Sequence, residues 1–136
     1  MLAILDVNVF VSAIVTPGGP ADRLVAAAEV GAVTLVVSPR LLAELSDVLH
    51  RHKFRRHLSP NEADQYVEGV RRMALLFPDP DPTGAHVRDV KDDYLVELTR
   101  SVRVAALVSG DKDLLAVDPA VVRVLTPREA LGEMGR

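Results

Sequence analysis

The stretch Leu2-Ala3-Ile4-Leu5-Asp6-Val7-Asn8 decides the fold, because a continuous apolar run stops at a carboxylate. The same pattern recurs late in the chain, where the apolar residues 104–108 precede Ser109-Gly110-Asp111-Lys112-Asp113. Uninterrupted runs of Val, Leu and Ile are typical of strands that are buried on both faces, as in parallel sheets. Because parallel strands end at the same edge of a sheet, we expect Asp6 and Asp111 to meet there.

The rest of the chain predicts strands alternating with helices. Further strands are expected over residues 33–37, 75–77 and 121–125, and helices or helical turns over residues 9–15, 21–30, 39–50, 90–102 and 113–117. Two capping boxes, Ser59-Pro60-Asn61-Glu62 and Thr126-Pro127-Arg128-Glu129, each predict the start of another helix. This order predicts an α/β protein with a mostly parallel five-stranded central sheet between helices, a three-layer α/β/α fold, formed by residues 1–136 as a single domain.

The composition limits the functions open to the chain. Of its 136 residues 49% are hydrophobic and none is cysteine, which excludes disulfides, thiolate zinc sites and cysteine nucleophiles. The lack of cysteine suits a reducing cytoplasm, the location that we expect. No apolar run reaches membrane-spanning length, and the N-terminal run stops at Asp6, unlike a signal peptide. We therefore expect no membrane partner.

The net charge of the chain and its local charge distribution differ in what they indicate about nucleic-acid binding. A net charge of −3 argues against a protein that coats nucleic acid by bulk charge. A local basic strip is nevertheless present, formed by Arg51, Lys53, Arg55 and Arg56 around Phe54. The strip has two interpretations, a set of contacts to RNA phosphates or an ordinary solvated helix end, and the sequence leaves both open.

Four acidic residues share a position at the end of a strand or early in a helix: Asp6, Glu44, Asp93 and Asp111. Carboxylates gathered at one edge do not all ionise unless a cation is present. Hard oxygen ligands without cysteine select Mg²⁺ or Mn²⁺ over zinc. The pattern therefore predicts a divalent-metal site suited to phosphoester hydrolysis.

The neighbouring acids have simpler roles open to them. Asp89 and Asp92 fit a helix cap and the protein surface, because the helix dipole favours acids in a first turn. Asp113 is either an additional acid of the site or the N-cap of the helical turn that follows it.

Four segments of the chain, taken in order, form a recognisable set. They are Ile4-Leu5-Asp6-Val7-Asn8-Val9, Ser38-Pro39 leading to Glu44, Arg88-Asp89-Val90-Lys91-Asp92-Asp93-Tyr94-Leu95, and Val108-Ser109-Gly110-Asp111-Lys112-Asp113-Leu114-Leu115. This set resembles the PIN-domain nucleases, and the closest branch is that of the PIN-family toxins of prokaryotic toxin–antitoxin systems, which are related to VapC-like toxins. The resemblance covers most of the chain, from Leu2 to Val117.

The resemblance implies a Mg²⁺- or Mn²⁺-dependent endoribonuclease that cleaves single-stranded RNA with metal-activated water. It also implies a homodimer and a cognate antitoxin that holds the enzyme inactive. The implied metal-binding and catalytic acids are Asp6, Glu44, Asp93 and Asp111, with Asp113 as an auxiliary catalytic acid.

Two further residues would orient these carboxylates by hydrogen bonds, Asn8 and Ser109. The chain departs from the family pattern at Val7, where a threonine or serine is usual; this removes a possible hydroxyl partner but no ligand.

Two alternatives compete with the nuclease. The first is a PIN-fold module that binds RNA or a protein without cutting. The second is a phosphatase of the haloacid-dehalogenase type, which also begins with an aspartate at a strand end. That class needs an aspartate where Asn8 stands and a threonine where Phe10 stands, so the residues disfavour it.

Overall fold

The structure, a computed structural model, describes residues 1–80, 90–103 and 106–134, with the side chains of residues 90–93 outside the description. Its centre is a five-stranded sheet in the order β3-β2-β1-β4-β5, and every neighbouring pair is parallel. The strands are β1 (Leu2–Leu5), β2 (Thr34–Val37), β3 (Leu75–Leu76), β4 (Ala106–Val108) and β5 (Val124–Leu125). The predicted parallel five-stranded sheet is confirmed.

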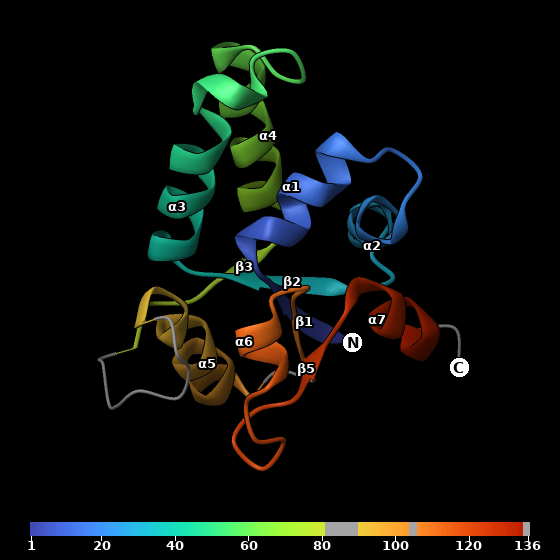
Figure 1. The fold of residues 1–136 in the computed structure, drawn as a ribbon, viewed down its shortest axis with the longest axis vertical. Helices are drawn as coiled ribbons and strands as arrows, with labels where there is room; N and C mark the ends of the chain where they lie inside the picture. Colours follow the sequence, from blue (N-terminus) through green and yellow to red (C-terminus); the bar gives the residue numbers. More distant parts are fainter. Residues whose placement is uncertain (81–89, 104–105, 135–136) are drawn as a thin grey trace.

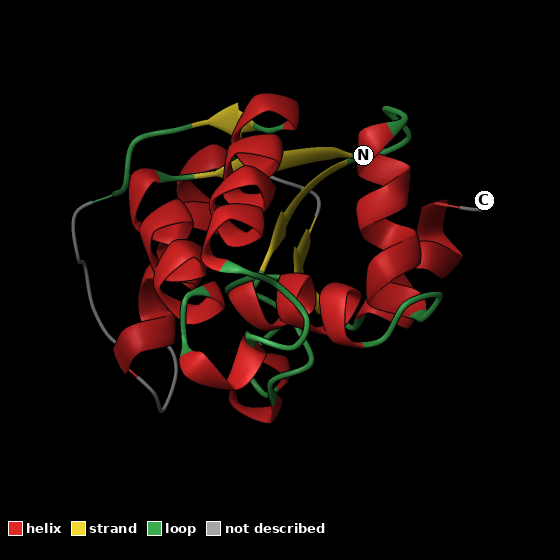
Figure 2. Ribbon diagram, turned by 90° about the horizontal axis from the view of Figure 1, so that it is seen from above, coloured by secondary structure: helices red, strands yellow, loops and turns green. Residues whose placement is uncertain are grey.

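Helices cover both faces of this sheet, as Figures 1 and 2 show. The first four helices, α1 (Val7–Val15), α2 (Pro20–Glu29), α3 (Pro39–Leu49) and α4 (Pro60–Met73), lie on one side. The other face is covered by α5 (Val90–Val102) and the short α6 (Lys112–Leu115), while α7 (Pro127–Met134) packs against α2 and β5. The three-layer α/β/α arrangement is therefore confirmed. In the described part of the chain, no helix is long and apolar enough to span a membrane.

Both predicted capping boxes form. The Ser59 hydroxyl accepts from the Glu62 N–H while the Glu62 carboxylate accepts from the Ser59 N–H, at the start of α4. Thr126 and Glu129 exchange the same pair of bonds before α7. Pro60 and Pro127 are each the first helical residue, where the missing N–H costs nothing.

Some predicted boundaries are wrong by a few residues, with local reasons. Helix α1 begins at Val7 rather than at residue 9, because the chain turns directly after β1 and the Val9 N–H bonds to the Asp6 carbonyl. Strand β5 begins at Val124 rather than at residue 121, because a turn bonds the Val121 N–H to the Asp118 carbonyl. Residues 104–105, predicted to open β4, lie outside the described residues.

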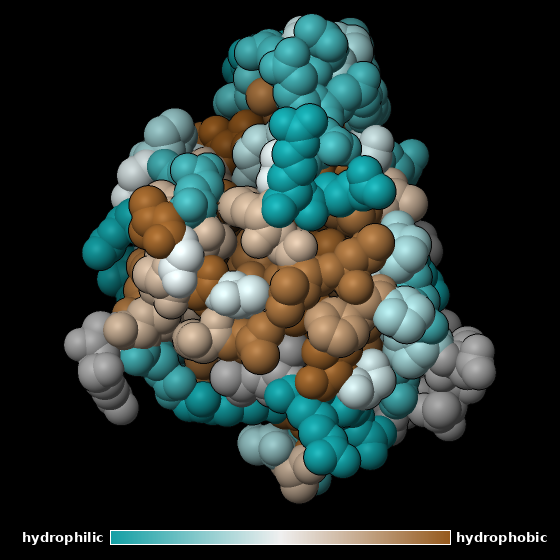
Figure 3. All heavy atoms as spheres, turned by 180° about the vertical axis from the view of Figure 1, so that it is seen from behind, coloured by the Kyte–Doolittle hydropathy of each residue, from teal (hydrophilic) through white to brown (hydrophobic). Residues whose placement is uncertain are grey.

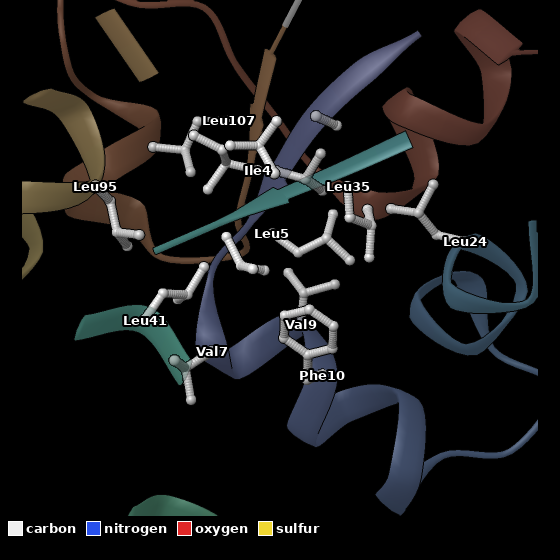
Figure 4. Close-up of a cluster of buried hydrophobic side chains, with 14 of the residues drawn as sticks. Ile4, Leu5, Val7, Val9, Phe10, Leu24, Leu35, Leu41, Leu95 and Leu107 are labelled. Atoms are coloured by element: carbon white, nitrogen blue, oxygen red, sulfur yellow. The ribbon is translucent and has the colours of Figure 1, made fainter. Parts of the chain in front are cut away.

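The core lies on both sides of β1 and β4 (Figure 4). Ile4 and Leu107 are fully buried in the central strands. Phe10 of α1 and Leu41 of α3 pack on one side of the sheet, and Leu95 of α5 lies on the other. Each such side chain contributes about 1.5–3 kcal/mol by leaving water. The buried strands and α1 hold the end of β1 in a fixed position.

One edge of the sheet is more exposed than the rest. The two leucines of the edge strand β3, Leu75 and Leu76, are 48% and 51% exposed. The face seen from behind in Figure 3 carries a broad apolar area bordered by polar residues.

Candidate functional site

Asp6 occupies the point where β1 ends and α1 begins. Its backbone N–H donates to the Val108 carbonyl at 2.9 Å, which continues the pairing of β1 with β4. The Asp6 residue is only 3% exposed to solvent. Although Asp6 is the N-cap residue of α1, its side chain makes no capping bond to that helix. The ordinary explanation for an aspartate at this position, a helix cap, therefore does not account for the side chain.

The Asp6 carboxylate is held by a buried hydroxyl group. The hydroxyl of Ser109, itself fully buried, donates to Asp6 Oδ2 at 2.8 Å. The backbone N–H of Asn8 also lowers the pKa of the carboxylate, although it forms no capping bond, and the Asn8 residue itself is exposed. The structure thus brings the Ser109 hydroxyl to Asp6, and Asn8 acts on Asp6 through its backbone.

Burial raises the pKa of Asp6 above its ordinary value of 3.8. The hydrogen bond from Ser109 and the nearby backbone N–H of Asn8 partly offset this effect, while the negative charges of Glu44 and Asp111 raise the pKa further. Glu44 and Asp111 are therefore each close enough to Asp6 for their charges to act on its carboxylate. A cation between them would relieve both the burial cost and the repulsion.

The turn after β4 links Ser109 to Asp111. The Asp111 N–H donates to Ser109 Oγ at 3.0 Å, and Asp111 Oδ1 accepts from the Asp113 N–H at 2.8 Å. Asp111 is consequently the N-cap of α6, and Asp113 lies in the first turn of that helix. The prediction that offered Asp113 as the cap is wrong by two residues, because α6 begins at Lys112 rather than at Leu114.

Tyr94 links Glu44, which lies on α3, to α5 on the other face of the sheet. The Tyr94 hydroxyl donates to Glu44 Oε2 at 2.7 Å, connecting α3 to α5. Burial, then the hydrogen bond to Glu44 and its charge, raise the pKa of Tyr94, so the hydroxyl keeps its proton as a donor. The guanidinium carbon of Arg40 lies 4.1 Å from the centre of the Tyr94 ring.

Tyr94 and Arg40 were missed by sequence reasoning. Two signals were available: an aromatic residue directly after Asp93, and an arginine one helical turn before Glu44.

The structure places Asp93 by its backbone alone. Asp92 and Asp93 lie in the first turn of α5, and Asp93 directly precedes Tyr94. Their side chains, and all of Asp89, lie outside the described residues. Among the side chains that the structure does describe, no three acidic or imidazole groups form a cluster able to hold a metal ion. The quartet therefore stays a prediction, for which the described support is that the charges of Glu44 and Asp111 raise the pKa of Asp6.

The basic strip lies at the other end of α3. The edge of the sheet where β1 and β4 end, at Asp6 and Asp111, is called the acidic edge below. Helix α3 begins with Pro39 beside this edge, and its eleven residues make it about 16 Å long. Arg51 pairs with Asp47 at 3.7 Å, and Arg55 donates to the His50 and Leu58 carbonyls. Lys53 lies 5.2 Å from the centre of the Phe54 ring. The structure does not bring these residues and Arg56 to the acids.

Two adjoining depressions open beside Asp111. One has a volume of about 400 Å³ and is lined by Asn8, Val9, Ser12, Gly110, Asp111 and Pro127. The other, of about 420 Å³, shares Ser12 and Pro127 with it and reaches Arg128. Asp111 is therefore accessible from solvent, with room beside it for an extended ligand along α1 and α7.

The fold and the buried acid at its carboxyl edge define a parallel α/β protein with an acidic site. A family model described as the PIN domain matches residues 3–113. The chain belongs to the PIN domain family. Comparison with curated proteins gives no match.

Two solved structures are similar to this fold. One is VapBC2 from Rickettsia felis bound to a DNA fragment from its promoter, with a TM-score of 0.63, 13% identity, and 93% of this chain and 98% of that chain covered. The other is PAE2754 from Pyrobaculum aerophilum, with a TM-score of 0.63, 12% identity, and 98% and 88% covered. At these identities the likeness concerns the fold.

Proposed function

We propose that this protein is a Mg²⁺- or Mn²⁺-dependent endoribonuclease that cleaves single-stranded RNA at the edge formed by β1 and β4. The observation that carries the proposal is the buried carboxylate of Asp6. It is fixed by Ser109, serves no capping bond, and lies within the electrostatic influence of Glu44 and Asp111. Membership of the PIN domain family, whose members are generally nucleases, supports the same activity.

The donor chemistry fits a hard divalent cation. Asp6, Glu44 and Asp111 offer carboxylate oxygens and the chain has no cysteine, which suits Mg²⁺ or Mn²⁺. We assign Asp93 as the fourth ligand, on its place in the first turn of α5. When bound, the metal supplies water activation and neutralises charge on the phosphate.

The protein's own groups would prepare these carboxylates. Ser109 fixes Oδ2 of Asp6, leaving the other oxygen to bind a ligand. Tyr94 fixes Oε2 of Glu44 in the same way. Oδ1 of Asp111 accepts a hydrogen bond from the Asp113 N–H, so Oδ2 is the atom that we assign to the metal. Asp113 lies in the first turn of α6, two residues after Asp111, and would orient the attacking water as an auxiliary acid.

The biological role that we propose is the toxin of a toxin–antitoxin pair in the cytoplasm. The support is the likeness in fold to VapBC2, a complex whose structure includes promoter DNA. A small antitoxin protein would hold the nuclease inactive. The exposed leucines of β3 support assembly of two copies. Co-purification with the product of an adjacent gene, and the mass of the purified protein in solution, test these two partners.

RNA cleavage tests the activity itself. Purified protein is incubated with labelled single-stranded and structured RNA in Mn²⁺ or in EDTA. We expect the wild type to cleave the single-stranded RNA in Mn²⁺ but not in EDTA, and we expect Asp6→Ala to cleave neither RNA. Asp47→Ala, which removes an exposed aspartate from α3, is the matched control and keeps full activity.

Cleavage that survives EDTA, or equal cleavage by Asp6→Ala, contradicts the proposal. RNA binding without cleavage in any metal would favour the non-catalytic PIN module instead.

A further inference from the structure

Arg40 is an exposed arginine with a fixed position beside the acidic edge. It is the second residue of α3, and its guanidinium lies over the Tyr94 ring at 4.1 Å. Stacking on an aromatic face orients the planar guanidinium and reduces the entropy lost when it binds a ligand. The ring itself is held by burial and by the bond from its hydroxyl to Glu44.

The guanidinium also has no carboxylate partner among the described residues. Within the part of the chain that the structure describes, Arg40 forms no ion pair, although its backbone N–H donates to Asp79 Oδ2 at 2.9 Å. Arg71 and Arg72, by contrast, each pair with Glu68 on their own helix, and Arg51 pairs with Asp47 of the preceding helix. An arginine that is oriented by stacking and lacks a carboxylate partner presents its N–H groups to an incoming anion.

Its neighbours identify the anion. Arg40 precedes Glu44 by four residues, so the two side chains lie on the same face of α3. Arg40, Glu44 and Asp6 all act electrostatically on Tyr94, which places the cation beside the acids. A phosphodiester that reaches those acids therefore passes within reach of Arg40.

We propose that Arg40 is a phosphate-binding residue of this site, oriented by Tyr94, and that it grips the RNA backbone next to the acidic edge. The inference rests on the proposed function for its substrate, single-stranded RNA. It gives the site a basic group that the strip at residues 51–56 does not supply from the far end of α3. Tyr94 then serves two positioning roles, with its ring under Arg40 and its hydroxyl on Glu44.

Binding rather than cleavage tests this inference. The anisotropy of a short labelled single-stranded RNA is followed as a function of salt, in Ca²⁺ and in EDTA, for the wild type and for Arg40→Ala, Arg40→Lys and Tyr94→Phe. Arg40→Ala is expected to weaken binding roughly 5- to 10-fold at low salt and to reduce the salt slope by about 0.7. Arg40→Lys keeps the charge without the planar fork, so we expect an intermediate loss.

Two variants separate this role from general effects. Arg71→Ala removes an exposed, paired arginine from α4 and is expected to change binding less than about 2-fold. Tyr94→Phe keeps the ring under Arg40, so RNA binding stays near the wild-type value. The loss of its hydrogen bond to Glu44 lowers kcat and leaves KM unchanged.

The inference is overturned if Arg40→Ala binds RNA as tightly as Arg71→Ala does, or if the wild type binds no RNA in either buffer. If the wild type never cleaves RNA but Arg40→Ala still weakens binding and lowers the salt slope, the nuclease proposal fails and the role of Arg40 stands.

Discussion

Removing the Ser109 hydroxyl tests how the buried acid is supported. The hydroxyl donates to Asp6 Oδ2 at 2.8 Å and accepts from the Asp111 N–H at 3.0 Å. A bond to a charged acceptor is worth about 1.5–3 kcal/mol and a neutral one about 1 kcal/mol. Ser109→Ala should therefore lower the free energy of unfolding by about 3 kcal/mol. For a chain of 136 residues the unfolding entropy is roughly 0.3 kcal/mol/K, so Tm should fall by about 10 °C.

Thermal unfolding in EDTA, followed by circular dichroism, measures this loss. The matched control is Ser101→Ala, because the Ser101 hydroxyl donates only to the Leu98 carbonyl within α5. The loss from Ser109→Ala should be largest at neutral pH and smaller in acid, where protonation removes the Asp6 charge. A Ser109→Ala variant whose stability at neutral pH matches that of Ser101→Ala would refute the reasoning.

Two further predictions concern stability. Because the folded pKa of Asp6 is raised above 3.8, the folded protein binds protons more tightly than the unfolded chain, and ionisation of Asp6 costs stability as pH rises through the folded pKa. In EDTA at neutral pH, Asp6→Asn should therefore raise the free energy of unfolding by about 1 kcal/mol, and this gain should shrink towards pH 3.8. Denaturant melts of both proteins across this pH range measure the difference. A difference that is constant with pH, or negative, would contradict the reasoning. Gly69→Ala should stabilise by about 0.5–1 kcal/mol, because its Cβ meets nothing within 4 Å inside α4, whereas Gly31→Ala at φ +81° should destabilise; equal signs in urea melts would argue against these backbone conformations.

The parallel sheet and the position of Asp6 were predictable from local pattern. Buried parallel strands are continuous apolar runs, and the residue that ends one lies at the carboxyl edge whatever the tertiary details. The capping boxes at Ser59 and Thr126 were predictable for the same reason, since each is complete within four residues.

The support around the acids was not predictable in the same way. Tyr94 and Glu44 are fifty positions apart, and no local pattern announces their hydrogen bond. That Asp111 and not Asp113 is the cap of α6 depends on where the chain turns after Gly110, which two acids separated by one residue leave open. The direction of α3 likewise decides that Arg40, and not Arg51, lies at the acidic edge.

Direct measurement of metal binding tests the central claim, that the acids at the ends of β1 and β4 form a divalent-metal site. Mn²⁺ is titrated calorimetrically into the wild type, Asp6→Asn and the exposed-residue control Asp47→Asn. The account predicts saturable binding to the wild type and to Asp47→Asn, and binding weakened at least about 10-fold in Asp6→Asn. Equal affinity in all three proteins, or no binding to the wild type, would contradict it.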